Sequence, residues 1–260
     1  ANAPTYNPNN RIGLAGAQLR NRALTDIFEP GSTMKPFAAA LALEKGKFRP
    51  ETTIQTAPGY LRIGSATIHD SHMHGILTVS QVIQKSSNVG AAKMALAFPP
   101  QEMWSMFDSL GFGTPLKLGF PGEVSGRLRP AKTWRPIEQA TMAYGHGISV
   151  TLMQLAHAYL AFARDGDLVP LSLTRMDAPP LAGKQVFSAQ TAREVRAMLE
   201  LVVLPGGTAP KAQVAGYRVA GKTGTAQWGS KQREQTAAWF AGVAPIDKPK
   251  YAFAVLYESD

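Results

Sequence analysis

The fold is decided around residues 28–45, which run FEPGSTMKPFAAALALEK. From Ser32 onward this stretch is apolar and rich in alanine, which predicts a helix over 32–45 that Gly46 ends. Pro36 is compatible with the helix because the first N–H groups of any helix have no partner within it. Since the helix is apolar on nearly every side, we expect it to be buried, with Ser32 and Lys35 at its start.

Helical and extended patterns alternate with turns along the rest of the chain. Apolar residues at helical spacing predict helices over 78–85, 88–98, 101–110, 137–144, 152–164 and 189–204. Strands are predicted over 217–227, 237–243 and 251–257, with turns and short strands over 47–78 and an irregular segment over 1–30. Helices in the middle and strands at the end predict an α+β domain, an antiparallel sheet covered by helices.

Composition limits the classes of protein that remain possible. The 260 residues are 45% hydrophobic and 17% charged, as in a folded protein with a sizeable core. The net charge is +9, but the basic residues are scattered, so we expect a solvated basic surface and no nucleic-acid partner. The lack of cysteine excludes disulfides and thiolate chemistry. No apolar run is long enough for a membrane span, which leaves open a soluble protein or an anchor outside these residues.

Three short motifs follow one another along the chain. They are Ser32-Thr33-Met34-Lys35 at the start of the buried helix, Ser86-Ser87-Asn88 between two helices, and Lys222-Thr223-Gly224-Thr225 on a strand. Each alone is weak, since the first can be an ordinary helix cap, the second an inter-helix turn and the third a strand end. All three in this order, each on the expected element, favour a catalytic site.

The first motif contains a candidate nucleophile and a candidate base. A serine hydroxyl attacks well only when a nearby base takes its proton, and Lys35 lies one helical turn from Ser32 on the same face. A lysine can be that base only if its pKa is lowered, which burial and a neighbouring cation such as Lys222 both favour. The positive end of the helix also lies where negative charge develops on an attacked carbonyl.

The second motif offers proton transfer and orientation. Ser86 can relay a proton between Lys35 and a leaving amine, while the Asn88 amide can orient the backbone of a substrate. We therefore predict Ser32, Lys35, Ser86, Asn88 and Lys222 as the catalytic residues.

The third motif offers a binding edge. Lys222, Thr223 and Thr225 present a charge and two hydroxyls to a terminal carboxylate. Gly224 lacks a side chain where an extended peptide must lie alongside the strand. We predict Thr223, Gly224 and Thr225 as substrate-binding residues.

These motifs and their surroundings resemble the class B penicillin-binding proteins. The resemblance rests on FEPGSTMKPF at 28–37, QKSSNVG at 84–90 and GKTGTA at 221–226. WRPIEQAT at 134–141 and YGHG at 144–147 look like the septal, cell-division branch of Gram-negative bacteria. The likeness runs nearly end to end. It implies the fold shared with serine β-lactamases, in which an all-helical subdomain adjoins the helix-covered antiparallel sheet.

The resemblance implies a peptidoglycan D,D-transpeptidase without a cofactor. Ser32 would attack a D-Ala-D-Ala stem peptide, release D-Ala and pass the acyl group to an amine on a neighbouring strand, and β-lactams would acylate it. The oxyanion hole would consist of the backbone N–H groups of Ser32 and Thr225. Implied partners are a septal glycosyltransferase and divisome proteins, with the domain in the periplasm on an inner-membrane anchor.

The resemblance also bears on domain organisation. In the family, further strands precede a segment like residues 1–10 and a helix follows the last strand. Residues 1–260 are therefore expected to be a transpeptidase domain trimmed at both ends, without an anchor or pedestal domain. In that case one sheet edge is exposed. The loop expected over 228–235 is short for the family.

Other functions remain open at this point. A serine β-lactamase or a β-lactam sensor shares all three motifs, although no Glu-x-x-Leu-Asn element of class A β-lactamases lies between the second and third. A catalytically dead scaffold for wall or division proteins is a further alternative, against which the intact Ser32, Lys35 and Lys222 argue. Fast deacylation would distinguish a β-lactamase from a transpeptidase.

Histidines provide the remaining alternative. His69, His72 and His74 lie close together with Asp70 between them, a spacing that can hold zinc. No separate ligand cluster accompanies them, so we predict no metal site. His146, in a glycine-rich turn, and His157, on a helix, are predicted to be structural.

Overall fold

A computed structural model describes residues 2–3, 5, 7, 9–10, 12–13, 16–178, 183–230 and 233–259. The helix predicted to begin at Ser32 has two parts. A 3₁₀ turn, η2 (Gly31–Met34), leads into α2 (Lys35–Glu44), which has a proline in its first turn. Gly31 has a φ of +54°, a conformation that favours glycine, and the tight turn places Ser32 just ahead of the regular helix.

Three long strands form the main sheet. They are β9 (Ala220–Ser230), β10 (Arg233–Ala244) and β11 (Tyr251–Ser259), antiparallel in the order β11-β10-β9. The loop predicted over 228–235 is wrong for 228–230 and 233–235, because Gln235 pairs with Trp228 and the ladder continues to Arg233 and Ser230. Residues 231 and 232 lie outside the described residues.

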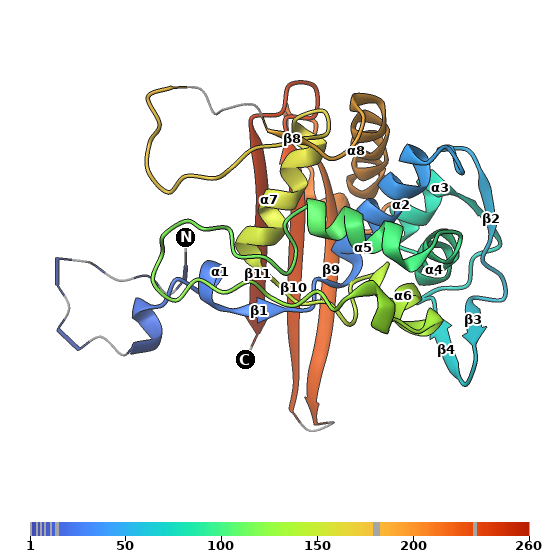
Figure 1. Ribbon diagram of the computed structural model, residues 1–260, viewed down its shortest axis with the longest axis horizontal. Coiled ribbons are helices and arrows are strands. Elements are labelled where there is room, and N and C mark those ends of the chain that lie inside the picture. Colours follow the sequence, from blue (N-terminus) through green and yellow to red (C-terminus); the bar gives the residue numbers. More distant parts are fainter. Residues whose placement is uncertain are drawn as a thin grey trace.

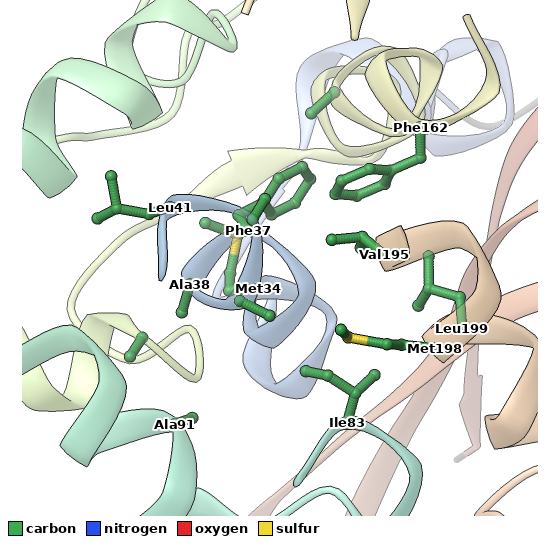
Figure 2. Close-up of a cluster of buried hydrophobic side chains, with 14 of the residues drawn as sticks. Met34, Phe37, Ala38, Leu41, Ile83, Ala91, Phe162, Val195, Met198 and Leu199 are labelled. Carbon is green, nitrogen blue, oxygen red and sulfur yellow. The ribbon is translucent and has the colours of Figure 1, made fainter. Parts of the chain in front are cut away.

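Helices cover this sheet and surround α2. The helix α7 (Leu152–Ala163) packs on β10 and β11, and α8 (Ala189–Val203) packs on β9 and α2 (Figure 1). Figure 2 shows the core between them, where Phe37 stacks on Phe162 with ring centroids 5.1 Å apart. As expected from its apolar sequence, α2 is buried along nearly its whole length.

A helical region lies on the side of α2 that faces away from the sheet (Figure 1). It contains α3 (Val79–Lys85), α4 (Asn88–Leu96), α5 (Pro100–Ser109) and α6 (Pro136–Met142), with α4 packed against both α2 and α6. The predicted fold class, an antiparallel sheet covered by helices with an adjoining helical part, is therefore confirmed. Within the described residues, no helix has the length and apolar character needed to cross a membrane.

Short elements complete the fold. The two-stranded ladders are β1 (Ile27–Phe28) with β6 (Val150–Thr151), β2 (Thr53–Gln55) with β5 (Ile76–Thr78), β3 (Tyr60–Ile63) with β4 (Ala66–His69), and β7 (Asp167–Leu168) with β8 (Lys184–Gln185). The remaining helical turns are η1 (Gly16–Leu19), α1 (Arg22–Thr25), η3 (Ala131–Thr133) and η4 (Pro210–Ala212). Residues 47–78 thus form turns and short strands, as predicted.

Candidate active site

The three sequence motifs meet at one cavity of about 320 Å³. The start of α2 contributes Ser32 and Lys35, the turn between α3 and α4 contributes Ser86 and Asn88, and β9 contributes the segment 223–225. Lys222 is not among the lining residues, although it precedes them directly on β9. Folding therefore brings together residues that are far apart in the sequence.

Lys35 is the centre of the hydrogen-bond network. Its Nζ lies 2.9 Å from Ser32 Oγ and 2.9 Å from Ser86 Oγ, and it also donates to the Ser86 carbonyl oxygen. The side chain is 0% exposed. Burial and then the charge of Lys222 hold the pKa of Lys35 well below its ordinary value, against a smaller opposing effect of Asp70. An amine with a lowered pKa can accept the Ser32 proton.

Lys222 is a second buried amine. It is 0% exposed, and burial lowers the pKa of Lys222 to about 7. Its nearest described partners are the Thr223 carbonyl oxygen at 3.3 Å and Thr223 Oγ1 at 3.4 Å, and no described carboxylate pairs with it. The predicted effect of Lys222 on the pKa of Lys35 agrees with this arrangement, although burial is the larger cause.

The turn between α3 and α4 is built to present Ser86. Ser86 has a φ of +61°, and the next residue, Ser87, caps α4 by accepting from Gly90 N at 2.9 Å. Asp70 fixes this turn: it accepts from Ser87 Oγ at 2.7 Å, from Val89 N at 3.0 Å and from Asn88 N. The sequence marked Asp70 only as a neighbour of histidines, since nothing local links it to the second motif.

Asn88 and Thr223, which both line the cavity, also have hydrogen-bond partners within the protein. Asn88 Nδ2 donates to the His69 carbonyl oxygen at 2.8 Å, which fixes the amide plane while its Oδ1 has no described partner. Thr223 Oγ1 lies 3.1 Å from Oγ1 of Thr208, which precedes η4 in the chain. Both side chains are thus held by the protein before any substrate arrives.

Gly224 has a packing reason that the sequence did not reveal. A Cβ built on Gly224 would lie 2.0 Å from Nε1 of Trp239, its partner on β10. That indole N–H donates to the Pro30 carbonyl oxygen at 2.8 Å, which joins the sheet to the turn preceding Ser32. Gly224 therefore makes room for the indole, whatever it also does for a substrate.

Of the two histidines predicted to be structural, one lines the cavity and the other lies inside the fold. His146, predicted to be structural, is exposed and lines the cavity, where its Nδ1 lies 3.0 Å from Glu29 Oε2. His157 is inside the fold and its Nε2 lies 2.7 Å from the Val169 carbonyl oxygen. His72 and His74 line the cavity, and no three His, Asp or Glu side chains of the described part come together as a possible metal site.

A serine hydrogen-bonded to a buried amine of lowered pKa, in an open cavity, defines a site suited to nucleophilic acyl transfer. The family model of the penicillin-binding protein transpeptidase domain matches residues 1–260, and the chain belongs to this family. The resemblance noted in the sequence is thereby confirmed.

Individual relatives agree with the family assignment. The chain is 44% identical to the probable peptidoglycan D,D-transpeptidase PbpC of Pseudomonas aeruginosa, over 100% of this chain and 46% of that protein. It is 42% identical to the peptidoglycan D,D-transpeptidase FtsI of Escherichia coli, over 98% of this chain and 44% of that protein. It thus spans less than half the length of both.

A solved structure shares the fold closely. The TP domain of Burkholderia pseudomallei penicillin-binding protein 3 matches with a TM-score of 0.87 and 51% identity, over 92% of this chain and 74% of that one. The arrangement of sheet and helices is therefore the arrangement of that domain.

Proposed function

We propose that this chain is the catalytic domain of a peptidoglycan D,D-transpeptidase. The observation that carries the proposal is the position of the buried Lys35 amine, 2.9 Å from the hydroxyls of both Ser32 and Ser86. One amine can thus take a proton from the nucleophile and pass it to a second hydroxyl. Membership of the transpeptidase family, and relatives named as D,D-transpeptidases, support the substrate class.

The acylation step follows from these contacts. Ser32 Oγ attacks the carbonyl between the two D-Ala residues of a stem peptide while Lys35 takes the hydroxyl proton. The backbone N–H groups of Ser32 and Thr225 stabilise the oxyanion, and the C–N bond breaks as the proton passes through Ser86 to the leaving amine. D-Ala departs, Lys35 is uncharged again, and the acyl group remains on Ser32.

Substrate binding falls to the walls of the cavity. Thr223, Gly224 and Thr225 form the edge along which the extended stem peptide lies, and Asn88 orients its backbone. The charge of Lys222 attracts the terminal carboxylate and lowers the pKa of Lys35. A β-lactam mimics the same peptide and leaves a stable ester on Ser32.

The proposed setting is septal wall synthesis, in line with the relative named FtsI. The transpeptidase would work in the periplasm, joined to the inner membrane outside the residues described, beside a septal glycosyltransferase and divisome proteins. No nucleic acid or cofactor takes part in this proposal.

The test is release of D-Ala from a D-Ala-D-Ala peptide in the presence of an amine acceptor. The wild type should release D-Ala and form the new amide, Ser32→Ala should do neither, and the matched variant Ser71→Ala, also on the cavity wall, should remain active. Equal activity of Ser32→Ala and wild type would refute the proposal. Rapid, repeated hydrolysis of penicillin would instead indicate a β-lactamase.

A further inference from the structure

A histidine and a glutamate form a polar pair at the active-site cavity for which the acylation step has no use. His146 lines the same cavity as Ser32, and its side chain is 58% exposed. Its Nδ1 lies 3.0 Å from Glu29 Oε2, while Glu29 Oε1 accepts from Gly147 N at 2.9 Å. Both carboxylate oxygens of Glu29 are therefore engaged with the turn that carries His146.

The backbone holds this pair close to the nucleophile. Gly31 N donates to the Gly145 carbonyl oxygen at 3.4 Å, so the residue before Ser32 touches the residue before His146. A Cβ on Gly145 would lie 2.2 Å from Gly31 N, so only glycine permits this approach. The ring of the buried Tyr144 lies edge-on to the His146 ring, with centroids 5.4 Å apart.

The contact with Glu29 sets which ring nitrogen is free. A carboxylate accepts hydrogen bonds, so Nδ1 of His146 carries the hydrogen in this pair and an uncharged ring has its lone pair on Nε2. No described residue bonds Nε2. The exposed nitrogen is thus a proton acceptor, held in one tautomer by Glu29.

The second half of transpeptidation needs such an acceptor. An amine in water near neutral pH is mostly an ammonium ion, which has no lone pair for attack. Two protons must leave it before the amide is complete: one returns to Ser32 Oγ as the ester bond breaks, through Ser86 and Lys35. The other must leave before the attack, and the Lys35 network handles only one proton at a time.

We propose that His146, oriented by Glu29, binds the acceptor ammonium and removes its first proton, which then passes to solvent. This inference rests on the proposed transpeptidase function. It assigns the part of the cavity wall formed by Tyr144 and His146 to the acceptor, and leaves the edge at 223–225 to the donor. Glu29 acts as a positioning residue, because it reaches the acceptor only through His146.

The test measures how one acyl-enzyme divides between two products. The chain is given a D-Ala-D-Ala peptide with a primary amine acceptor, and the ratio of amide product to hydrolysed product is measured. This ratio cancels any change in acylation, since both products come from the same acyl-enzyme. We expect His146→Gln to lower the ratio by about 10²-fold, the lower end of what general-base assistance typically contributes.

Two further variants sharpen the test. Glu29→Gln should lower the ratio similarly, because a glutamine amide can donate to Nδ1 and move the ring hydrogen to Nε2. The matched control His72→Gln, an exposed histidine elsewhere on the cavity wall, should leave the ratio unchanged. Hydroxylamine, which is uncharged at the assay pH, should restore the amide yield of His146→Gln towards that of the wild type.

Three results overturn the inference. They are an unchanged ratio in His146→Gln, an equal defect with hydroxylamine and with the charged amine, and a defect in His72→Gln as large as that in His146→Gln. If the wild type forms no acyl-enzyme at all, the proposed transpeptidase function fails instead.

Discussion

At the scale of single residues, the site is defined by two buried lysines, because burial disfavours the charged form of an amine. Both Lys35 and Lys222 are 0% exposed, and the hydrogen-bond partners of their amines in the described structure are hydroxyl and carbonyl oxygens. Burial favours the uncharged form of both amines, and the charge of Lys222 further lowers the pKa of Lys35. The fold thereby makes the Lys35 amine a better proton acceptor than an exposed lysine, whose pKa is not lowered.

Replacing the base should abolish most of the acylation. Lys35→Met keeps the volume and apolar stem of the side chain but removes the proton acceptor for Ser32. We expect the rate of acylation by a fluorescent penicillin to fall by about 10²- to 10⁴-fold. Lys85→Met, which removes another lysine of the cavity wall, is the control and should stay close to the wild-type rate. Wild-type kinetics in Lys35→Met would contradict the assignment.

Lys222 should also leave a mark on the pH dependence of stability. Burial lowers the pKa of Lys222 to about 7, from 10.5 in the unfolded chain, so between these values the unfolded state binds more protons. The free energy of unfolding therefore rises with pH across this window, and the charge destabilises the fold most below pH 7. Lys222→Met lacks this contribution.

Denaturant unfolding from pH 6 to pH 9 measures the effect. We expect the wild type to gain stability relative to Lys222→Met as pH rises above 7, with a slope approaching ~1.4 kcal/mol per pH unit. A difference that stays constant, or that shrinks with rising pH, would show that the Lys222 amine is not buried as described.

At the scale of elements, the site depends on side-chain hydrogen bonds that fix one element against another. Asp70, just after β4, holds the first turn of α4, and the Trp239 indole of β10 holds the Pro30 carbonyl ahead of η2. Neither residue touches the reacting atoms. Each fixes the position of one that does, Ser86 in the first case and Ser32 in the second.

Removing the Asp70 carboxylate should loosen the start of α4. Asp70→Ala deletes the acceptor of Ser87 Oγ and of two backbone N–H groups, which should cost about 2 kcal/mol in the free energy of unfolding. Asp108→Ala, at an exposed position on α5, should change stability by less than about 0.5 kcal/mol. Equal unfolding midpoints for the two variants would mean that Asp70 does not stabilise the start of α4.

Filling the space at Gly224 should disturb the junction of sheet and turn. In Gly224→Ala the new methyl group meets the Trp239 indole and breaks its hydrogen bond to the Pro30 carbonyl oxygen. We expect the free energy of unfolding to fall by about 1–3 kcal/mol and acylation to become slower. Gly75→Ala is the control, because a Cβ there meets nothing within 4 Å. A Gly224→Ala protein as stable as Gly75→Ala would show that the indole is not confined.

At the scale of the whole molecule, the sequence predicted what local patterns encode. Apolar patterns predicted α2, α7 and α8, and the three motifs predicted segments that folding brings to one cavity. It could not predict contacts made only by folding, such as Asp70 with Ser87 or Gly224 with Trp239. The strand ends at 228–230 and 233–235 were missed because cross-strand pairing, not local propensity, extends the ladder there.

His146 shows the same limit at the active site. A histidine between two glycines gave no local reason to place it in the cavity that Ser32 lines, and it was predicted to be structural. Its position follows from the approach of Gly145 to Gly31, a contact between segments far apart in the chain. The close backbone approach that Gly145 permits thus appears only in three dimensions.

Mass spectrometry after exposure to benzylpenicillin and digestion with a protease shows directly whether Ser32 is the nucleophile. If folding places the Ser32 hydroxyl against a buried Lys35 amine whose pKa is lowered, one penicilloyl group should appear on the peptide containing Ser32, and none in Ser32→Ala. An adduct on another residue, or no adduct on the folded wild type, would contradict the account.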